Sequence, residues 1–232
     1  MTKYITGLLV LTIGAFFVFE ENYKYTEVIE PAALLEPYWS EAGAGAAQLF
    51  MARTDKFNMT VAPLSGYTVS GLVMKVKKNN SPFSSLSKIR AVQPATVSLA
   101  FADNLRTGAY KTAKHSLGSL NWPQQPGFNA AQFKEITLVT ADKDAKMKIN
   151  SLKPGDQITL AGLCVTKVDI FVKDEQSGQP QFTLTGEPDG SLLYLADPAA
   201  LKILRRGSTT AYRLFLTFGL LTAVMILLKF KY

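Results

Sequence analysis

Two long apolar runs without a charged residue, one near each end, constrain this chain more than any other feature. They cover residues 4–19 and 214–228, and all 18 acidic residues lie between them. Sixteen residues of helix span about 24 Å, and flanking aromatic and basic residues extend each run toward the roughly 30 Å of a bilayer core. The pattern therefore predicts two transmembrane helices with a domain between them.

The charges next to these runs predict an orientation. Lys3 precedes the first run, and Lys229 and Lys231 follow the second. Short basic tails favour the cytoplasmic side, which predicts a two-pass protein of the bacterial inner membrane with cytoplasmic termini and a periplasmic central domain. A cleaved signal peptide is the alternative for the first run, but residues 16–20 offer no small-x-small cleavage pattern. A buried helix of a soluble domain is the alternative for either run.

The central segment has the size of one ordinary domain. Of the 232 residues, roughly 180 remain between the apolar runs, enough for a single core. Three of the 25 basic residues flank the ends, which leaves 22 basic and 18 acidic groups and a net charge of +4. This mild excess suits an anionic lipid surface and disfavours a nucleic acid partner. The single cysteine, Cys164, excludes an intrachain disulfide and does not decide the compartment.

Alternating apolar residues predict a mainly β domain. The expected strands cover residues 67–77, 95–102, 135–139, 157–173, 181–187 and 191–195, with a helix over 142–152 and a type II turn at 153–156. The predicted fold class is a small curved β-barrel, similar to the oligonucleotide/oligosaccharide-binding (OB) type, with one or two short helices and two flanking transmembrane α-helices. An open sheet packed on one helix is the alternative.

The expected organisation has five parts. They are an N-terminal transmembrane helix (1–21), a stalk with a short helix (22–60), a β-rich extracytoplasmic domain (61–196), a basic juxtamembrane helix (197–207) and a C-terminal transmembrane helix (208–232). Contact with the membrane surface is predicted for Lys202, Arg205, Arg206 and Arg213. An ordinary linker helix is the alternative for the juxtamembrane segment. Close packing of the spanning helices is predicted at Gly7, Gly14 and Gly219.

Three central stretches carry a resemblance. They are GYTVSGLVMKV at 66–76, LSK…VSLAFADN within 84–104, and EITLVTADKDAKMKINSLKPGDQITLAGLCV at 135–165. Over about a hundred residues the chain resembles a group of uncharacterised bacterial inner-membrane proteins with an OB-like periplasmic domain. Residues 107–132 depart from that group, and its members do not supply the second transmembrane helix. The resemblance implies a fold and a location, and it implies no activity.

The sequence offers little catalytic chemistry. The one histidine, His115, lies in a polar segment, and with only Cys164 beside it no His/Cys metal cluster can form. No glycine-rich phosphate loop occurs. We therefore predict no catalytic residue, no metal and no cofactor. A hydrolase that uses His115, with Ser116 or Ser119 in the same segment, is kept as an alternative.

One group of residues has the composition of a ligand-binding face. It consists of Lys75, Lys77, Lys78 and Arg90, with Tyr110 available to stack on a base or sugar. A solvated face balanced by acidic residues elsewhere is the alternative.

These observations predict a non-catalytic assembly or scaffold subunit of a larger envelope complex, held near the bilayer and using its OB-like domain as a protein-docking surface. Its expected partners are membrane lipids and either other subunits of a membrane complex or further copies of itself. The alternative is a binding module for single-stranded nucleic acid or an anionic glycan, and the second alternative is the hydrolase.

Overall fold

The computed structural model describes a mainly β domain. It covers Gly14 and residues 18–40, 48–79, 89–116, 119–121, 127–173 and 179–208, together with three separate helical residues, Arg213, Thr217 and Leu221. The side chains of residues 115, 116 and 119 lie outside this description.

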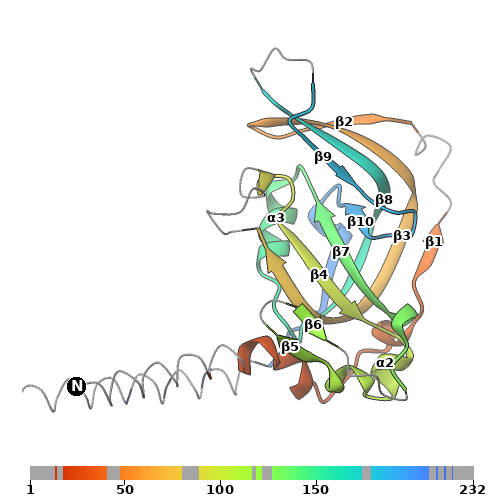
Figure 1. Cartoon of the computed structure of the whole chain (residues 1–232), viewed down its shortest axis with the longest axis vertical. Helices are drawn as coiled ribbons and strands as arrows, with labels where there is room; N and C mark the ends of the chain where they lie inside the picture. Colours follow the sequence, from red (N-terminus) through yellow and green to blue (C-terminus); the bar gives the residue numbers. More distant parts are fainter. Residues whose placement is uncertain are drawn as a thin grey trace, which may run out of the picture.

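Two long, curved strands form the centre of the main sheet (Figure 1). They are β3 (Phe57–Lys78) and β8 (Gln157–Val172), which pair antiparallel from Phe57 opposite Val172 to Leu72 opposite Gln157. Inward and outward residues alternate along the first part of β3, as expected of a strand with one buried face. The register shifts on both sides of Pro63, which has no N–H for the ladder, and such bulges bend a strand.

The other strands continue the sheet from these two. Pairing runs from β3 through β4 (Ala95–Ala100), β7 (Phe133–Val139) and β10 (Leu192–Tyr194) to β8, and the β3–β8 pairs return it to its start. Only the β7–β10 pairing is parallel among the described strands. β1 (Tyr38–Ser40) and β2 (Phe50–Arg53) also pair with β3, while β9 (Phe182–Thr185) and β11 (Leu201–Arg205) pair with β8. A separate pair is formed by β5 (Lys114–Ser116) and β6 (Ser119–Asn121).

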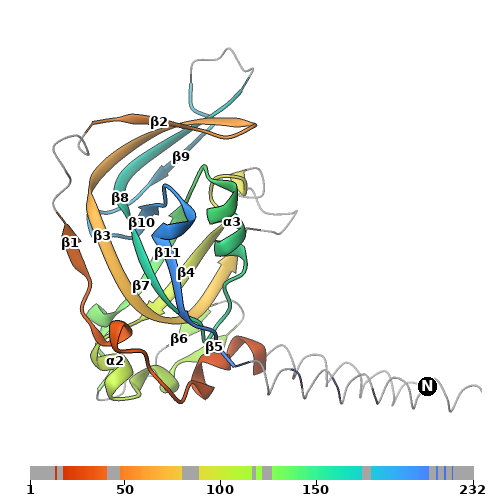
Figure 2. The same cartoon turned by 180° about the vertical axis from the view of Figure 1, so that it is seen from behind.

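Short helical elements cover the ends of the sheet. α3 (Lys143–Asn150) lies beside β11 on the side seen in Figure 2, between β7 and β8 in the sequence. At the opposite end from β2 lie α2 (Asp103–Arg106) and the 3-10 helix η1 (Asn22–Tyr25). The other 3-10 helices among the described residues are η2 (Pro31–Leu34), η4 (Ala109–Thr112), η5 (Ala130–Gln132) and η6 (Pro198–Ala200).

The buried apolar side chains of the described residues form three clusters. The first joins the sheet to α3, whose Ile149 packs with Leu152 against residues of β3, β4, β7 and β8. The second includes Phe57, Met59 and Val61 of β3. The third lies under the N-terminal segment and α2. A fully buried aliphatic or aromatic side chain contributes about 1.5–3 kcal/mol to stability, so these clusters hold the sheet and helices together.

All six predicted strands are confirmed, and so is the turn before β8; residues 181–187 and 191–195 contain β9 and β10. Residues 67–77, 95–102, 135–139 and 157–173 overlap β3, β4, β7 and β8. Gly155, in the predicted type II turn, has φ of +90°, as that turn requires at its third position.

The prediction of membrane-spanning helices is not supported and is corrected here. Among the residues that the structure describes, no helix has both the length and the apolar character needed to cross a bilayer. The longest described helix, α3, has eight residues and spans about 12 Å. Most of residues 4–19 and 214–228 lie outside the described ranges. The fold class is therefore corrected from an OB-like barrel between two transmembrane helices to a mostly β fold with few helices, and the two-pass inner-membrane location with cytoplasmic termini is not supported.

The predicted juxtamembrane helix at 197–207 is also wrong. Residues 198–200 form η6, and the following five form the strand β11. Leu201 and Ile203 pair with Leu160 and Ile158 of β8, and Leu201 is fully buried. Tertiary pairing with a long neighbouring strand has overridden a local pattern that fits a helix equally well.

Candidate anion-binding site

A cavity of about 640 Å³ lies where three parts of the chain meet, and basic side chains dominate its lining. One wall is the turn from β2 to β3, residues 53–56. The second is residues 90 and 91, which precede β4. The third is the beginning of α3, residues 141–143 and 146. The lining residues are Arg53, Thr54, Asp55, Lys56, Arg90, Ala91, Ala141, Asp142, Lys143 and Lys146.

Local hydrogen bonds fix the hairpin wall. Thr54 Oγ1 accepts from the backbone N–H of Phe57 at 3.0 Å, and the N–H of Thr54 donates to the Phe57 carbonyl at 2.8 Å. A hydroxyl that bonds its own turn favours this tight connection. The closed turn therefore holds Lys56 at the tip of the hairpin, next to Arg53 at the end of β2.

The helical wall is fixed in the same way. Asp142 caps α3 by accepting from the Ala145 N–H at 2.7 Å, and its own N–H donates to Thr140 Oγ1 at 3.0 Å. The N–H of Thr140 donates to the carbonyl of Val92 at 2.9 Å, which ties the second wall to the third. An Asp at this position satisfies a helix N–H that has no partner within the helix.

The lining carries an excess of positive charge. Five cationic side chains face two carboxylates, which leaves a net charge of +3. Asp55 pairs with Lys143 at 3.2 Å, both largely exposed, and Asp142 is engaged in the cap. Within the described part of the chain, no ion pair is formed by the other four cations, which are Arg53, Lys56, Arg90 and Lys146.

The pKa of Lys146 is lowered by its position in the cavity wall. Burial lowers it from its ordinary value, and the guanidinium of Arg90 lowers it further. Both effects disfavour the protonated amine, and a nearby anion would oppose the second.

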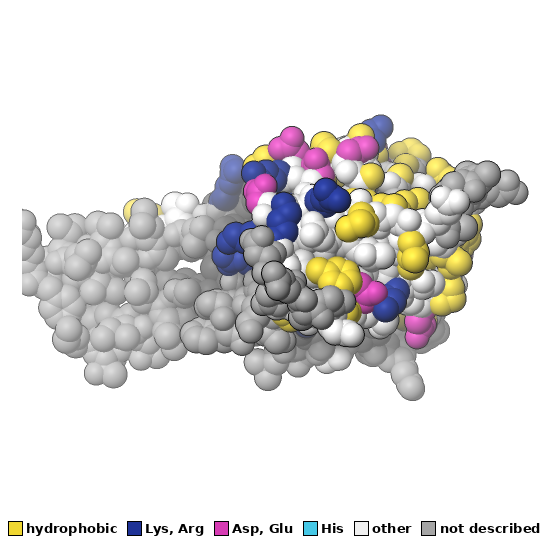
Figure 3. Space-filling model, turned by 90° about the horizontal axis from the view of Figure 1, so that it is seen from above, with side chains coloured by type: hydrophobic (Ala, Val, Ile, Leu, Met, Phe, Trp, Pro, Cys, Tyr) yellow, Lys and Arg dark blue, Asp and Glu magenta, His cyan; other side chains and the backbone are white. Residues whose placement is uncertain are grey.

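Figure 3 looks onto the end of the molecule that carries β2 and β9, where Lys and Arg side chains gather on one part of the face and hydrophobic side chains spread over another.

The ligand-binding face predicted from sequence is only partly assembled. Arg90 lines the cavity, whereas Lys78 donates to the carbonyl of Asn150 at 2.6 Å, at the other end of α3. Tyr110 is buried in the third core cluster and donates to the carbonyl of Thr26 at 3.1 Å, so it is no stacking platform. Lys75 and Lys77 lie on the last part of β3, outside the cavity lining.

Sequence reasoning missed most of the cavity cations. Lys143 and Lys146 are three residues apart, so they share one face of the helix that the sequence predicts, and this was an available signal. Arg53 and Lys56 flank a Thr-Asp pair typical of a turn. Nothing local shows that the turn and the helix meet.

A row of exposed apolar side chains is a second surface feature. Five large ones, 43–68% exposed, lie on or directly before the edge strands β1 and β2 and on the adjoining part of β3. They are Tyr38, Trp39, Leu49, Met51 and Leu64. We call this set the apolar row.

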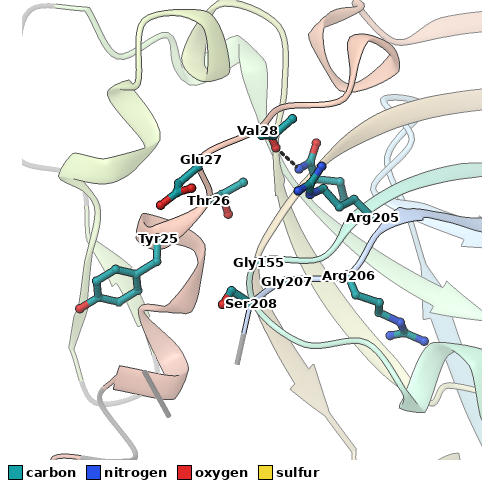
Figure 4. Close-up of a pocket in the computed structure, with 10 residues that line it drawn as sticks. Tyr25, Thr26, Glu27, Val28, Gly155, Arg205, Arg206, Gly207 and Ser208 are labelled. Atoms are coloured by element: carbon teal, nitrogen blue, oxygen red, sulfur yellow. Dashed lines mark hydrogen bonds between the residues drawn. The ribbon is translucent and has the colours of Figure 1, made fainter. Parts of the chain in front are cut away.

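A smaller cavity, of about 200 Å³, lies where the two terminal segments meet (Figure 4). Residues 25–28 form one side and residues 205–208 the other, with Gly155 and Gln157 between them. The Gln157 amide donates to the Val28 carbonyl at 2.7 Å and accepts from the Glu30 N–H at 2.6 Å. Through these two bonds the buried Gln157 side chain holds the N-terminal segment against β8.

The residues predicted to contact a membrane surface have other positions. Arg206 forms an ion pair at 3.0 Å with the fully buried Asp156, and Arg205 lies 3.7 Å from Glu30. Lys202 is exposed on β11, and Arg213 is a separate helical residue. Of the predicted helix-packing glycines, Gly14 is described as helical, while residues 7 and 219 lie outside the described ranges.

The described residues give no support to the other candidates for chemistry, which are the histidine with its neighbouring serines, the cysteine and a metal site. The backbone of His115 lies in β5, but its side chain is outside the description, as are those of Ser116 and Ser119. Cys164 is buried, and burial raises the pKa of its thiol, which disfavours the reactive thiolate. In the described ranges, no three His, Cys, Asp or Glu residues are grouped so that they could hold a metal ion.

Comparisons with known proteins add no relative: no family model, no curated protein and no solved structure matches this chain. The resemblance to inner-membrane proteins with an OB-like domain stays a prediction.

Proposed function

We propose that this protein is a binding module for anionic ligands and that the basic cavity is its binding site. The observation that carries the proposal is that four cationic side chains from three different elements line one cavity without an acidic partner among the described residues. Like charges brought together cost free energy, and a bound anion would offset that cost. This proposal develops the ligand-binding alternative of the sequence rather than the assembly subunit.

Salt-dependent binding tests the proposal. The full-length protein is titrated with a fluorescent single-stranded oligodeoxynucleotide and, separately, with a polyuronate, and anisotropy is read at several salt concentrations. Four phosphate contacts on a single strand predict that log Kd rises with log salt at a slope of about 3. Absence of binding at low salt for both probes, and for small inorganic anions as well, would end the proposal.

Matched variants locate the binding. Arg90→Ala removes one cavity cation and reduces the salt slope by about 0.7 for the oligonucleotide. Lys202→Ala removes an equal charge from β11, outside the cavity lining, and leaves the slope unchanged. Equal weakening by both variants would indicate binding to net charge rather than to the cavity.

A second candidate function is assembly with further copies of the same chain through the apolar row. It is favoured by the position of the row on edge strands: among the described strands β2 pairs only with β3, and it carries the exposed Met51. Exposed apolar edges are templates for pairing with another chain. Sedimentation of the full-length protein tests this function, because Met51→Lys dissociates such an assembly, whereas Met147→Lys, at an exposed site on α3, does not.

A further inference from the structure

We infer that the basic cavity recognises two linked phosphoryl groups, so that its ligand is a small organic diphosphate. This inference rests on the proposed function and narrows it from anions in general to one chemical class.

The charge of the lining matches that of a diphosphate. The residues around the cavity sum to +3. A phosphate monoester carries about −1.5 to −2 at neutral pH, and linking a second phosphoryl group brings the total to about −3. A carboxylate or a sulfate ester, with a single charge, would leave two positive charges uncompensated. A single diphosphate therefore carries enough negative charge to neutralise the site.

The cations approach from three directions. Arg53 ends β2 and Lys56 lies in the turn that follows, while Arg90 belongs to the segment before β4 and Lys146 to α3. A guanidinium is a planar fork that binds two phosphate oxygens at once, whereas an ammonium acts as a point charge. Two forks on different walls favour a ligand with two sets of oxygens rather than a single tetrahedral anion.

The helix end supports this arrangement without being the site itself. Lys143 and Lys146 lie in the first half of α3, where the helix dipole adds partial positive charge. The Asp142 carboxylate already caps the Ala145 N–H. The anion is thus held by side chains from the three walls rather than by the helix amides.

The volume fits a small molecule. The cavity measures about 640 Å³, which lies within the range of about 300–1,000 Å³ usual for small-molecule sites. Two phosphoryl groups would fill only part of it, so an organic group can lie over Ala91 and Ala141, whose short side chains leave space on two walls. Burial first and the guanidinium of Arg90 second lower the pKa of Lys146, and a bound diphosphate would oppose the effect of Arg90.

Calorimetric titration of the full-length protein tests the inference with four probes: inorganic pyrophosphate, orthophosphate, sulfate and the single-stranded oligonucleotide. The expected result is that pyrophosphate binds at least about tenfold more tightly than orthophosphate or sulfate. Arg53→Ala and Arg90→Ala each raise the Kd for pyrophosphate by about tenfold or more, since hydrogen bonds to charged groups are among the stronger ones. Lys202→Ala leaves that Kd unchanged.

The outcomes separate the two proposals. Equal affinity for pyrophosphate, orthophosphate and sulfate overturns the inference, and so does oligonucleotide binding that depends on Arg90 without any pyrophosphate binding; both leave anion binding in place. Failure of every probe, with the thermal unfolding of the protein intact, overturns the inference and the proposed function together.

Discussion

Replacing Asp156 by alanine should destabilise the fold strongly, because this buried carboxylate joins two segments of the chain. Its carboxylate is fully buried, and it accepts three hydrogen bonds. The donors are the Arg206 guanidinium at 3.0 Å, the Gly207 N–H at 2.8 Å and the Lys153 N–H at 3.2 Å. It therefore joins the turn before β8 to the segment that follows β11.

The expected cost is about 3 kcal/mol. Breaking a buried ion pair costs about 3–5 kcal/mol when the remaining charge stays buried. Arg206 is about half exposed and keeps its bonds to Ser151, so water relieves much of that penalty. The two backbone N–H groups lose a charged acceptor, at about 1–3 kcal/mol for each group left unsatisfied. For a chain of this size the melting temperature falls by about 6–12 °C.

Thermal unfolding followed by circular dichroism measures this effect on the full-length protein. Asp156→Asn keeps an acceptor for Gly207 and should lose about half as much. Arg206→Ala removes the half-exposed partner and should lose less than Asp156→Ala. A melting temperature for Asp156→Ala within about 2 °C of the parent protein would refute the reasoning that this carboxylate holds the two segments together.

Three further outcomes are expected. The pKa of Lys146 in the ligand-free protein lies below the ordinary 10.5, and because binding favours the protonated amine, the affinity for pyrophosphate falls as pH rises through that pKa. The Lys146→Arg variant should keep its affinity over the same pH range. Identical pH profiles for the parent protein and the variant in titration calorimetry would contradict this. Burial is the main cause that raises the pKa of Tyr67 to about 12, and the nearby negative charge of Asp189 is the next. The stabilisation from Tyr67 is therefore complete below about pH 10 and lost as pH rises toward 12, so urea unfolding should show a steeper alkaline decline than in Tyr67→Phe. Gly155→Ala should lower the melting temperature more than Gly108→Ala. Both glycines have a positive φ, but of the two only Gly155 has other atoms within 4 Å of the position that a Cβ would take. Equal losses of melting temperature in the two variants would count against this packing.

The strands that could be predicted are those whose residues alternate along a long pairing. β3 and β8 show this alternation, and the turn before β8 has its own sequence signal in Pro154 and Gly155. β11 could not be predicted, because Leu201–Arg205 fits a helix as well as a strand. Its conformation depends on β8, whose residues lie about forty positions earlier in the chain.

The cavity was less predictable than the fold. Arg90 was identified as a ligand-face residue from its charge alone, and the structure places it in the lining. Tyr110 was assigned to the same face, but packing with the N-terminal segment buries it. Arg53 and Lys146 line the same cavity because β2 pairs with β3 and α3 follows β7. No local sequence pattern predicts that arrangement.

Hydrogen–deuterium exchange of the full-length protein, with and without pyrophosphate, tests the central claim most directly because it reports where an anion binds. The account predicts slower exchange in peptides that contain residues 53–56, 90–93 and 141–146, and no change around residues 205–208. Protection confined to the terminal segments, or spread evenly over the basic residues of the chain, would contradict the assignment of the cavity as the binding site.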